Sequence, residues 1–178
     1  MFLLYNKGQN IKVILKGLNM KITLLTVGKI KEKYFTDAIA EYAKRLSRYC
    51  KLEIVEVADE KTPDGASEAL EAQIKEKEGE RILAKVPDSA YVVALAIEGK
   101  QLNSEELAKK MEQWNVSGVS HMVFIIGGSL GLAPKVLNRA DFKLSFSKMT
   151  FPHQLMRVVL LEQVYRSFRI RNNEPYHK

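Results

Sequence analysis

An apolar run that ends in a cluster of glycines, at residues 122–131, most constrains the fold of this chain. The letters MVFII describe a strand that is buried on both faces, and the turn GGSLG follows it directly. Glycines at a strand end let backbone groups approach a ligand that any Cβ would keep away. A second strand at 141–146 opens in the same way into a polar loop and then a helix. Two such loops are typical of a small-molecule site at one edge of an α/β sheet.

Strands and helices alternate along the chain. The apolar spacing predicts strands at 21–28, 52–57, 91–97, 122–126 and 141–146, and helices at 31–49, 66–85, 103–114, 133–139 and 152–168. Asn103 and Glu106 predict a capping box at the start of one helix. The helix at 66–85 is highly charged, so we expect a solvated face, with Leu70, Ile74 and Ile82 pointing inward. The alternation predicts an α/β fold, a mainly parallel sheet flanked by helices on both faces.

Composition limits the class of protein. The chain has 178 residues, 46% of them hydrophobic and 28% charged, which suits one folded domain. A net charge of +7 fits a polyanionic partner such as RNA, and fits simple solubility equally well. No apolar run approaches the roughly 20 residues that span a bilayer. The single cysteine, Cys50, and the scattered histidines predict a cytoplasmic protein without a metal site.

Residues 1–19 differ from the rest of the chain. They contain no acidic residue, and their apolar run is too short for a signal peptide. We therefore expect a non-native or leader extension at 1–19, with Met20 as the natural start and one domain at 20–178. An edge strand at 11–15 is the alternative.

The helix at 152–168 carries apolar side chains around most of its circumference, although one core requires only one apolar stripe. Its apolar residues are Leu155, Met156, Val158, Val159, Leu160, Leu161, Val164, Tyr165 and Phe168. This pattern predicts a second apolar contact, most simply a homodimer. A central core helix in a monomer is the alternative.

The end of the chain is basic, and we expect it to be too polar to bury itself. Its candidate RNA-binding residues are Arg166, Arg169, Arg171, Asn172, Asn173, Tyr176 and His177. Arginine suits phosphate, asparagine suits base edges, and tyrosine or histidine can stack on an unpaired base. A solvated tail without function is the alternative.

Five segments together resemble one family. They are KITLLTVGK at 21–29, LAIEG at 95–99, IIGGSLG at 125–131, SFSKMTFPHQLMR at 145–157 and RNNEPYHK at 171–178. With them, residues 20–178 resemble the SPOUT-class family of the ribosomal RNA large-subunit methyltransferases H. The resemblance implies a SPOUT-type fold with a C-terminal trefoil knot, and a homodimer that acts on the assembled ribosome. It further implies methylation of N3 of a pseudouridine in the helix 69 loop of 23S rRNA.

The same resemblance implies S-adenosylmethionine as the methyl donor. Carried over by position, its binding residues are Leu95, Gly127, Gly128, Phe146, Ser147, Lys148, Met149, Thr150 and Phe151. Because neutral N3 is a poor nucleophile, a base or a cation should assist the loss of its proton. The catalytic candidates are His153, Arg157 and His177, and the sequence does not decide which is the base. His153 could equally serve as a hydrogen-bonding residue at the helix start.

Two other functions compete with this interpretation. A non-catalytic RNA- or ribosome-binding module would use the basic tail and leave the pocket empty. A tRNA methyltransferase would share the fold class and differ in its substrate. The paired loops at 127–131 and 146–151 favour an enzyme over a binding module, because a module has no need of them.

Overall fold

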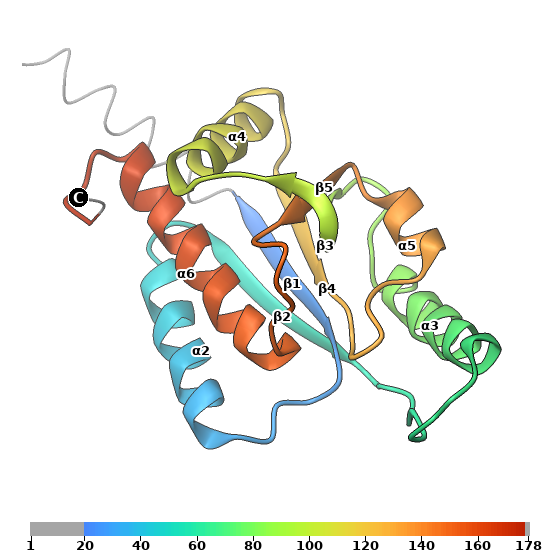
Figure 1. Ribbon diagram of the computed structural model, residues 1–178. Coiled ribbons are helices and arrows are strands. Elements are labelled where there is room, and N and C mark those ends of the chain that lie inside the picture. Colours follow the sequence, from blue (N-terminus) through green and yellow to red (C-terminus); the bar gives the residue numbers. More distant parts are fainter. Residues whose placement is uncertain (1–19, 177–178) are drawn as a thin grey trace, which may run out of the picture.

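The computed structural model describes residues 20–176, which form a sheet between two layers of helices (Figure 1). The strands are β1 (Lys21–Val27), β2 (Lys51–Val57), β3 (Tyr91–Gln101), β4 (His121–Ile126) and β5 (Phe142–Ser145). The helices are α2 (Lys33–Leu46), α3 (Glu68–Leu83), α4 (Ser104–Val116), α5 (Pro134–Arg139) and α6 (His153–Arg171).

The strands of the sheet follow the order β2-β1-β4-β3-β5. All of its strand pairings are parallel, which confirms the predicted α/β class. Parallel strands bring their carboxyl ends to the same edge of a sheet. The loops that follow β3, β4 and β5 therefore meet at one edge.

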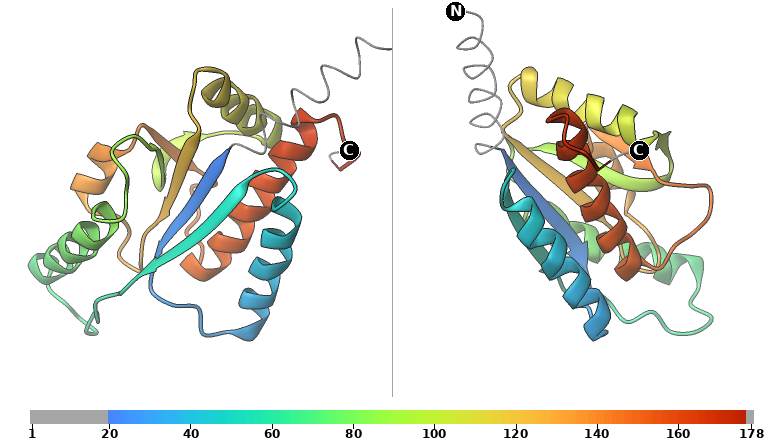
Figure 2. Two further views of the ribbon diagram at one scale, coloured as in Figure 1. Left: turned by 180° about the vertical axis from the view of Figure 1, so that it is seen from behind. Right: turned by 90° about the vertical axis from the view of Figure 1, so that its left-hand side faces the viewer.

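The two faces of the sheet bury separate cores, and helices cover both faces (Figure 2). On one face α2, α4 and α6 cover the larger core, which includes Phe124, Met111 and Leu160. On the other face α3 and α5 contribute Ile82 and Val136. Apolar burial on both faces explains why the central strands read as continuous apolar runs.

Three element ends differ from the sequence prediction by three residues or more. α2 ends at Leu46 instead of 49. β3 continues past residue 97 to Gln101, because Lys100 and Gln101 pair with Leu144 and Ser145 of β5 beyond a bulge. α6 continues to Arg171 instead of ending at 168. The predicted capping box of α4 is confirmed: Asn103 accepts from the N–H of Glu106, whose carboxylate accepts from the N–H of Asn103.

Ile74 and Ile82 of α3 are buried as expected, but the expected solvated face was wrong at Glu78. Glu78 and Gly79 are buried together with Ile74 and Ile82. A Cβ on Gly79 would come within 2.9 Å of the Cβ of Ala133, so the glycine allows α3 to lie close against the start of α5. A glycine inside a charged helix was the available signal for this close approach.

The expectation that the tail could not bury itself was also wrong. The ring of Tyr176 lies edge-on to the ring of Tyr165, with centroids 5.1 Å apart. Its hydroxyl donates to Glu162 at 3.2 Å. The tail therefore folds back onto α6, because Tyr176 has an aromatic surface and a polar partner to meet there.

The buried side of α6 faces the sheet through Leu160, Leu161 and Val164. Leu155 and Val159, on the side away from this core, are half-buried within the single chain. This half-buried apolar side is compatible with a second copy, and the homodimer stays a prediction. So does the C-terminal trefoil knot.

Within residues 20–176, no helix is long and apolar enough to cross a membrane. The same part of the chain holds no cluster of three His, Cys, Asp or Glu side chains suited to a metal ion. Cys50 is buried, and burial raises the pKa of its thiol to about 12. The predicted leader at 1–19 and the candidate His177 lie outside the described residues.

Candidate active site

A cavity of about 680 Å³ lies at the carboxyl edge of the sheet. Three segments line it: the middle of β3, the glycine turn after β4, and the loop from β5 into α6. The lining residues are Leu95, Ala96, Ile97, Ile126, Gly127, Gly128, Ser129, Leu130, Gly131, Leu144, Ser145, Phe146, Ser147, Met149, Thr150, Phe151, Pro152, His153 and Met156. The two loops that the sequence singled out thus form one site.

The glycine turn closes on itself. The N–H of Gly131 donates to the carbonyl of Gly128 at 3.1 Å, and the two residues form an isolated antiparallel bridge. Gly131 has a φ of +83°, where an L side chain is strained, and open space beside its Cα. A Cβ on Gly127 would instead come within 2.7 Å of the Gly131 carbonyl oxygen. We expected a Cβ at this position to occupy space needed by the ligand. In the structure it would instead clash with the other end of the turn.

The loop after β5 is held by two serines. Buried Ser145 donates from its hydroxyl to the carbonyl of Ser147 at 3.1 Å. The Ser147 hydroxyl accepts from the N–H of Met149 at 2.9 Å. These bonds fix a tight bend between the strand and the residues that follow it. The bend sets how the loop faces the cavity.

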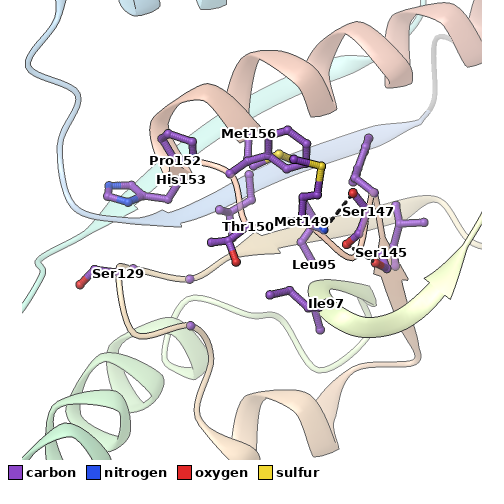
Figure 3. A pocket seen from close by; sticks show the side chains of 18 of the residues that line it. Leu95, Ile97, Ser129, Ser145, Ser147, Met149, Thr150, Pro152, His153 and Met156 are labelled. Carbon is purple, nitrogen blue, oxygen red and sulfur yellow. Dashed lines mark hydrogen bonds between the residues drawn. The ribbon is translucent and has the colours of Figure 1, made fainter.

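The cavity has largely apolar side chains with polar groups toward its ends. In Figure 3, Met149 and Met156 lie between a pair of serines, Ser145 and Ser147, and His153 at the other end. Several apolar residues around the cavity are exposed: Ile97 by 50%, Met149 by 70% and Phe151 by 39%. A flat, partly apolar ligand would cover this surface.

His153, the first residue of α6, lines the cavity beside Pro152. Burial lowers the pKa of His153, and the nearby Arg157 guanidinium lowers it further. The carboxylates of Asp59 and Glu32 oppose this shift by smaller amounts. The imidazole is therefore neutral at physiological pH, which a proton acceptor requires.

Arg157, the second catalytic candidate, does not line the cavity. It is 1% exposed, and its Nη2 donates to the carbonyl oxygens of Val27 at 2.8 Å and Gly28 at 2.9 Å. Its Nη1 forms an ion pair with Glu56 at 2.7 Å. Arg157 thus ties the first turn of α6 to the ends of β1 and β2. A direct catalytic role for it stays a prediction that this geometry does not favour.

A carboxylate that the sequence did not single out lies behind the glycine turn. Glu78 is 5% exposed, and its Oε2 would lie 3.1 Å from a Cβ on Gly128. Its Oε1 accepts from the N–H of Glu60 at 2.9 Å. Burial raises the pKa of Glu78, and the N–H of Glu60 partly counters this. Glu78 therefore supports the turn from the face opposite the cavity.

Most of the predicted cofactor residues line the cavity. Lys148 is the exception, because its side chain is exposed and it is absent from the lining. Sequence reasoning missed Ile97 and Met156 among the lining residues. Met156 follows His153 by three positions, so helical spacing places both on the same side of α6.

The predicted RNA-binding residues are at the other end of α6. Arg166 pairs with Glu162 at 2.6 Å, and Arg169 with Glu174 at 2.8 Å. Asn173 takes a left-handed conformation, with a φ of 52°, where the chain turns back. None of residues 166–176 lines the cavity of its own chain.

Comparison with known proteins identifies the family. The family model described as "Predicted SPOUT methyltransferase" matches residues 20–177. Ribosomal RNA large subunit methyltransferase H of Bifidobacterium adolescentis is 69% identical over 159 residues, which cover 89% of this chain and all of that protein. Ribosomal RNA large subunit methyltransferase H 1 of Clostridium perfringens is 62% identical over the same lengths.

A solved structure supports the fold. A probable methylase family protein from Haemophilus influenzae Rd KW20 superposes with a TM-score of 0.50 at 16% identity. The match covers 90% of this chain and 71% of that one. At this identity the likeness concerns the fold alone, and the sequence matches carry the family. The chain belongs to the SPOUT methyltransferase family, among the relatives that bear the name ribosomal RNA large subunit methyltransferase H.

Proposed function

We propose that this protein transfers a methyl group from S-adenosylmethionine to large-subunit rRNA, at N3 of a pseudouridine in the helix 69 loop of the assembled ribosome. The name shared by relatives 69% and 62% identical supports rRNA as the substrate. The cavity formed by both signature loops is the observation that carries the proposal. An activity on ribosomes implies a cytoplasmic protein.

The residues present fit S-adenosylmethionine. A cavity of about 680 Å³ lies within the usual range for sites that hold small molecules and cofactors. Leu95, Phe146 and Met156 supply apolar walls for the adenine ring. The exposed backbone of the turn at 127–131 and of the loop at 145–151 supplies hydrogen bonds for its edges. A Cβ on Gly127 or Gly128 would lie too close to neighbouring atoms. Both positions therefore suit glycine, which leaves their backbone groups uncovered by side chains.

The transfer requires an acceptor nitrogen that has lost its proton. When bound, S-adenosylmethionine would supply an electrophilic methyl group for this nitrogen. His153 is the base in this proposal, because it lines the cavity and its lowered pKa keeps it neutral. Arg157 positions His153 by fixing the first turn of α6, and its charge helps to keep the imidazole neutral.

The position of the tail supports a homodimer. Tyr176 docks at Glu162, nine residues beyond His153 and so about 14 Å further along the helix axis. The tail of one chain is therefore held away from its own cavity. We propose that residues 172–177 complete the active site of the second subunit, where they hold the target base.

The competing functions predict different substrates. A tRNA methyltransferase would transfer label from S-adenosylmethionine to tRNA, and a binding module would transfer none. The test is to offer the purified protein labelled S-adenosylmethionine with assembled ribosomes, isolated large subunits and tRNA in parallel. We expect label in the rRNA of assembled ribosomes. Label in tRNA alone would contradict the proposal, and so would ribosome binding without any transfer.

A further inference from the structure

A cluster of unpaired cations lies between the end of α2 and the start of β2. Lys44, Arg48 and Lys51 are exposed, and among residues 20–176 none of the three has an ion-pair partner. We call these three residues the basic corner. They fall within eight positions of the chain, where α2 ends and β2 begins. Unpaired surface cations so concentrated attract a polyanion.

The acidic residues near the basic corner are already neutralised. Glu41 pairs with Arg45 at 2.8 Å, and Glu53 pairs with Lys21 at 2.7 Å. On the tail, Glu174 pairs with Arg169. The ion pairs leave the charge of the basic corner uncompensated. The excess of positive charge is therefore present at the basic corner as well as in the chain as a whole.

The basic corner adjoins the tail. Tyr49, inside the segment, donates its hydroxyl to Glu174, and its ring stacks on Phe168 with centroids 5.5 Å apart. Burial, with this hydrogen bond, raises the pKa of Tyr49 to about 12, so the hydroxyl stays a donor. Figures 1 and 2 show the end of α2 beside the last turns of α6 and the end of the described chain. Tyr49 thus packs the segment that carries the corner directly against α6 and the tail.

We infer that the basic corner binds the phosphate backbone of the rRNA substrate while the tail engages the target base. The inference rests on the proposed function, and adds a contact surface outside the signature motifs. A protein partner fits less well, because interface cores carry large apolar side chains. None of the large exposed apolar residues lies in segment 44–51: they are Tyr34, Ile54, Ile97, Val116, Met149 and Phe151.

The test compares two matched pairs of lysines. Lys44→Gln/Lys51→Gln removes two charges from the corner, whereas Lys77→Gln/Lys85→Gln removes two exposed lysines from the α3 side of the sheet. Ribosome affinity is measured for each across a series of salt concentrations. The slope of log K against log salt is negative, and each lost phosphate contact makes it shallower by about 0.7 to 0.9. We expect the corner variant to lose about 1.5 in slope and about tenfold in affinity at low salt.

The α3 control should keep the wild-type slope, and both variants should keep their affinity for S-adenosylmethionine. A corner variant with unchanged slope and affinity would overturn the inference, as would an equal loss in the control. A photo-reactive residue at Arg48 adds a second measurement. Crosslinks from it to rRNA support the inference, and crosslinks only to ribosomal protein overturn it.

The outcomes separate this inference from the proposed function. If the wild type transfers no methyl group but the corner variant still loses salt dependence, the proposed reaction fails and the RNA surface stands. If the wild type methylates rRNA and the corner variant binds ribosomes as tightly as the wild type, only the proposed RNA-binding surface is contradicted.

Discussion

The carbonyl oxygen of Gly131 lies so close to Gly127 that a Cβ on Gly127 would approach it to 2.7 Å. The two ends of the turn therefore touch, and a larger residue at Gly127 would open the turn before it reached a ligand. Gly131 is different, since it has a φ of +83° and nothing within 4 Å of a Cβ position. It permits a substitution that strains the backbone without a steric clash.

Replacing Gly131 with alanine should weaken cofactor binding. The left-handed conformation costs an L residue about 1 to 2 kcal/mol, and the turn can relieve this only by shifting its backbone. Gly118→Ala is the matched control, because Gly118 also has a positive φ, +102°, and open space, but lies beyond α4 outside the cavity. Both variants should lose similar stability in urea. Calorimetry should find lower affinity for S-adenosylmethionine only in Gly131→Ala.

Arg157→Ala should destabilise the protein more than it changes the chemistry. The substitution leaves Glu56 and the carbonyls of Val27 and Gly28 without their donor. Water can solvate Glu56, which is 33% exposed, but a buried carbonyl left without its donor costs about 1 to 3 kcal/mol. Urea unfolding at neutral pH measures this loss. Wild-type stability combined with abolished transfer would instead make Arg157 a catalytic residue.

The rate of methyl transfer should report the protonation of His153. Burial and Arg157 lower the pKa of His153 below its ordinary value, so the neutral base persists as the pH falls toward that value. We expect the single-turnover rate to hold between about pH 8 and 6.5, the ordinary pKa of histidine, and to fall only in more acidic solution. His153→Asn should lose this acid limb together with most of the rate. An unchanged acid limb in the variant would assign the base elsewhere.

Truncation of the tail should separate assembly from catalysis. Deleting residues 173–178 removes the contact of Tyr176 with Tyr165, which is worth about 1 kcal/mol. The fold and cofactor affinity should survive, while transfer to ribosomes is lost. Mixing the truncated chain with Gly131→Ala chains should restore activity, because a mixed dimer contains one intact cavity and one intact tail facing it. If each chain used its own tail, mixing would restore nothing.

The sequence predicted the α/β class and the pairing of the two loops because both follow from local patterns. Continuous apolar strands indicate burial on two faces, and parallel strands bring their following loops to one edge. Residues that depend on distant contacts were harder to place. Glu78 meets the glycine turn only through the packing of α3, and Arg157 looked catalytic because its carbonyl partners are about 130 positions away.

The position of the tail also depends on contacts that its sequence does not reveal. Its composition is polar, and composition favours a solvated end. Tyr176 nevertheless finds Tyr165 and Glu162 because the left-handed turn at Asn173 reverses the chain. The left-handed turn at Asn173 thus brings Tyr176 into contact with α6, although the residue types of this segment predict exposure.

Mapping the transferred methyl group tests the proposed reaction most directly. Ribosomes from a bacterial strain that lacks this methyltransferase would be incubated with the protein and labelled S-adenosylmethionine, and the rRNA digested and analysed by mass spectrometry. We expect one added methyl group, at N3 of a pseudouridine in the helix 69 loop, that requires assembled ribosomes and an intact turn at Gly131. A methyl group at any other nucleotide, or none despite measurable cofactor binding, would contradict the proposed reaction.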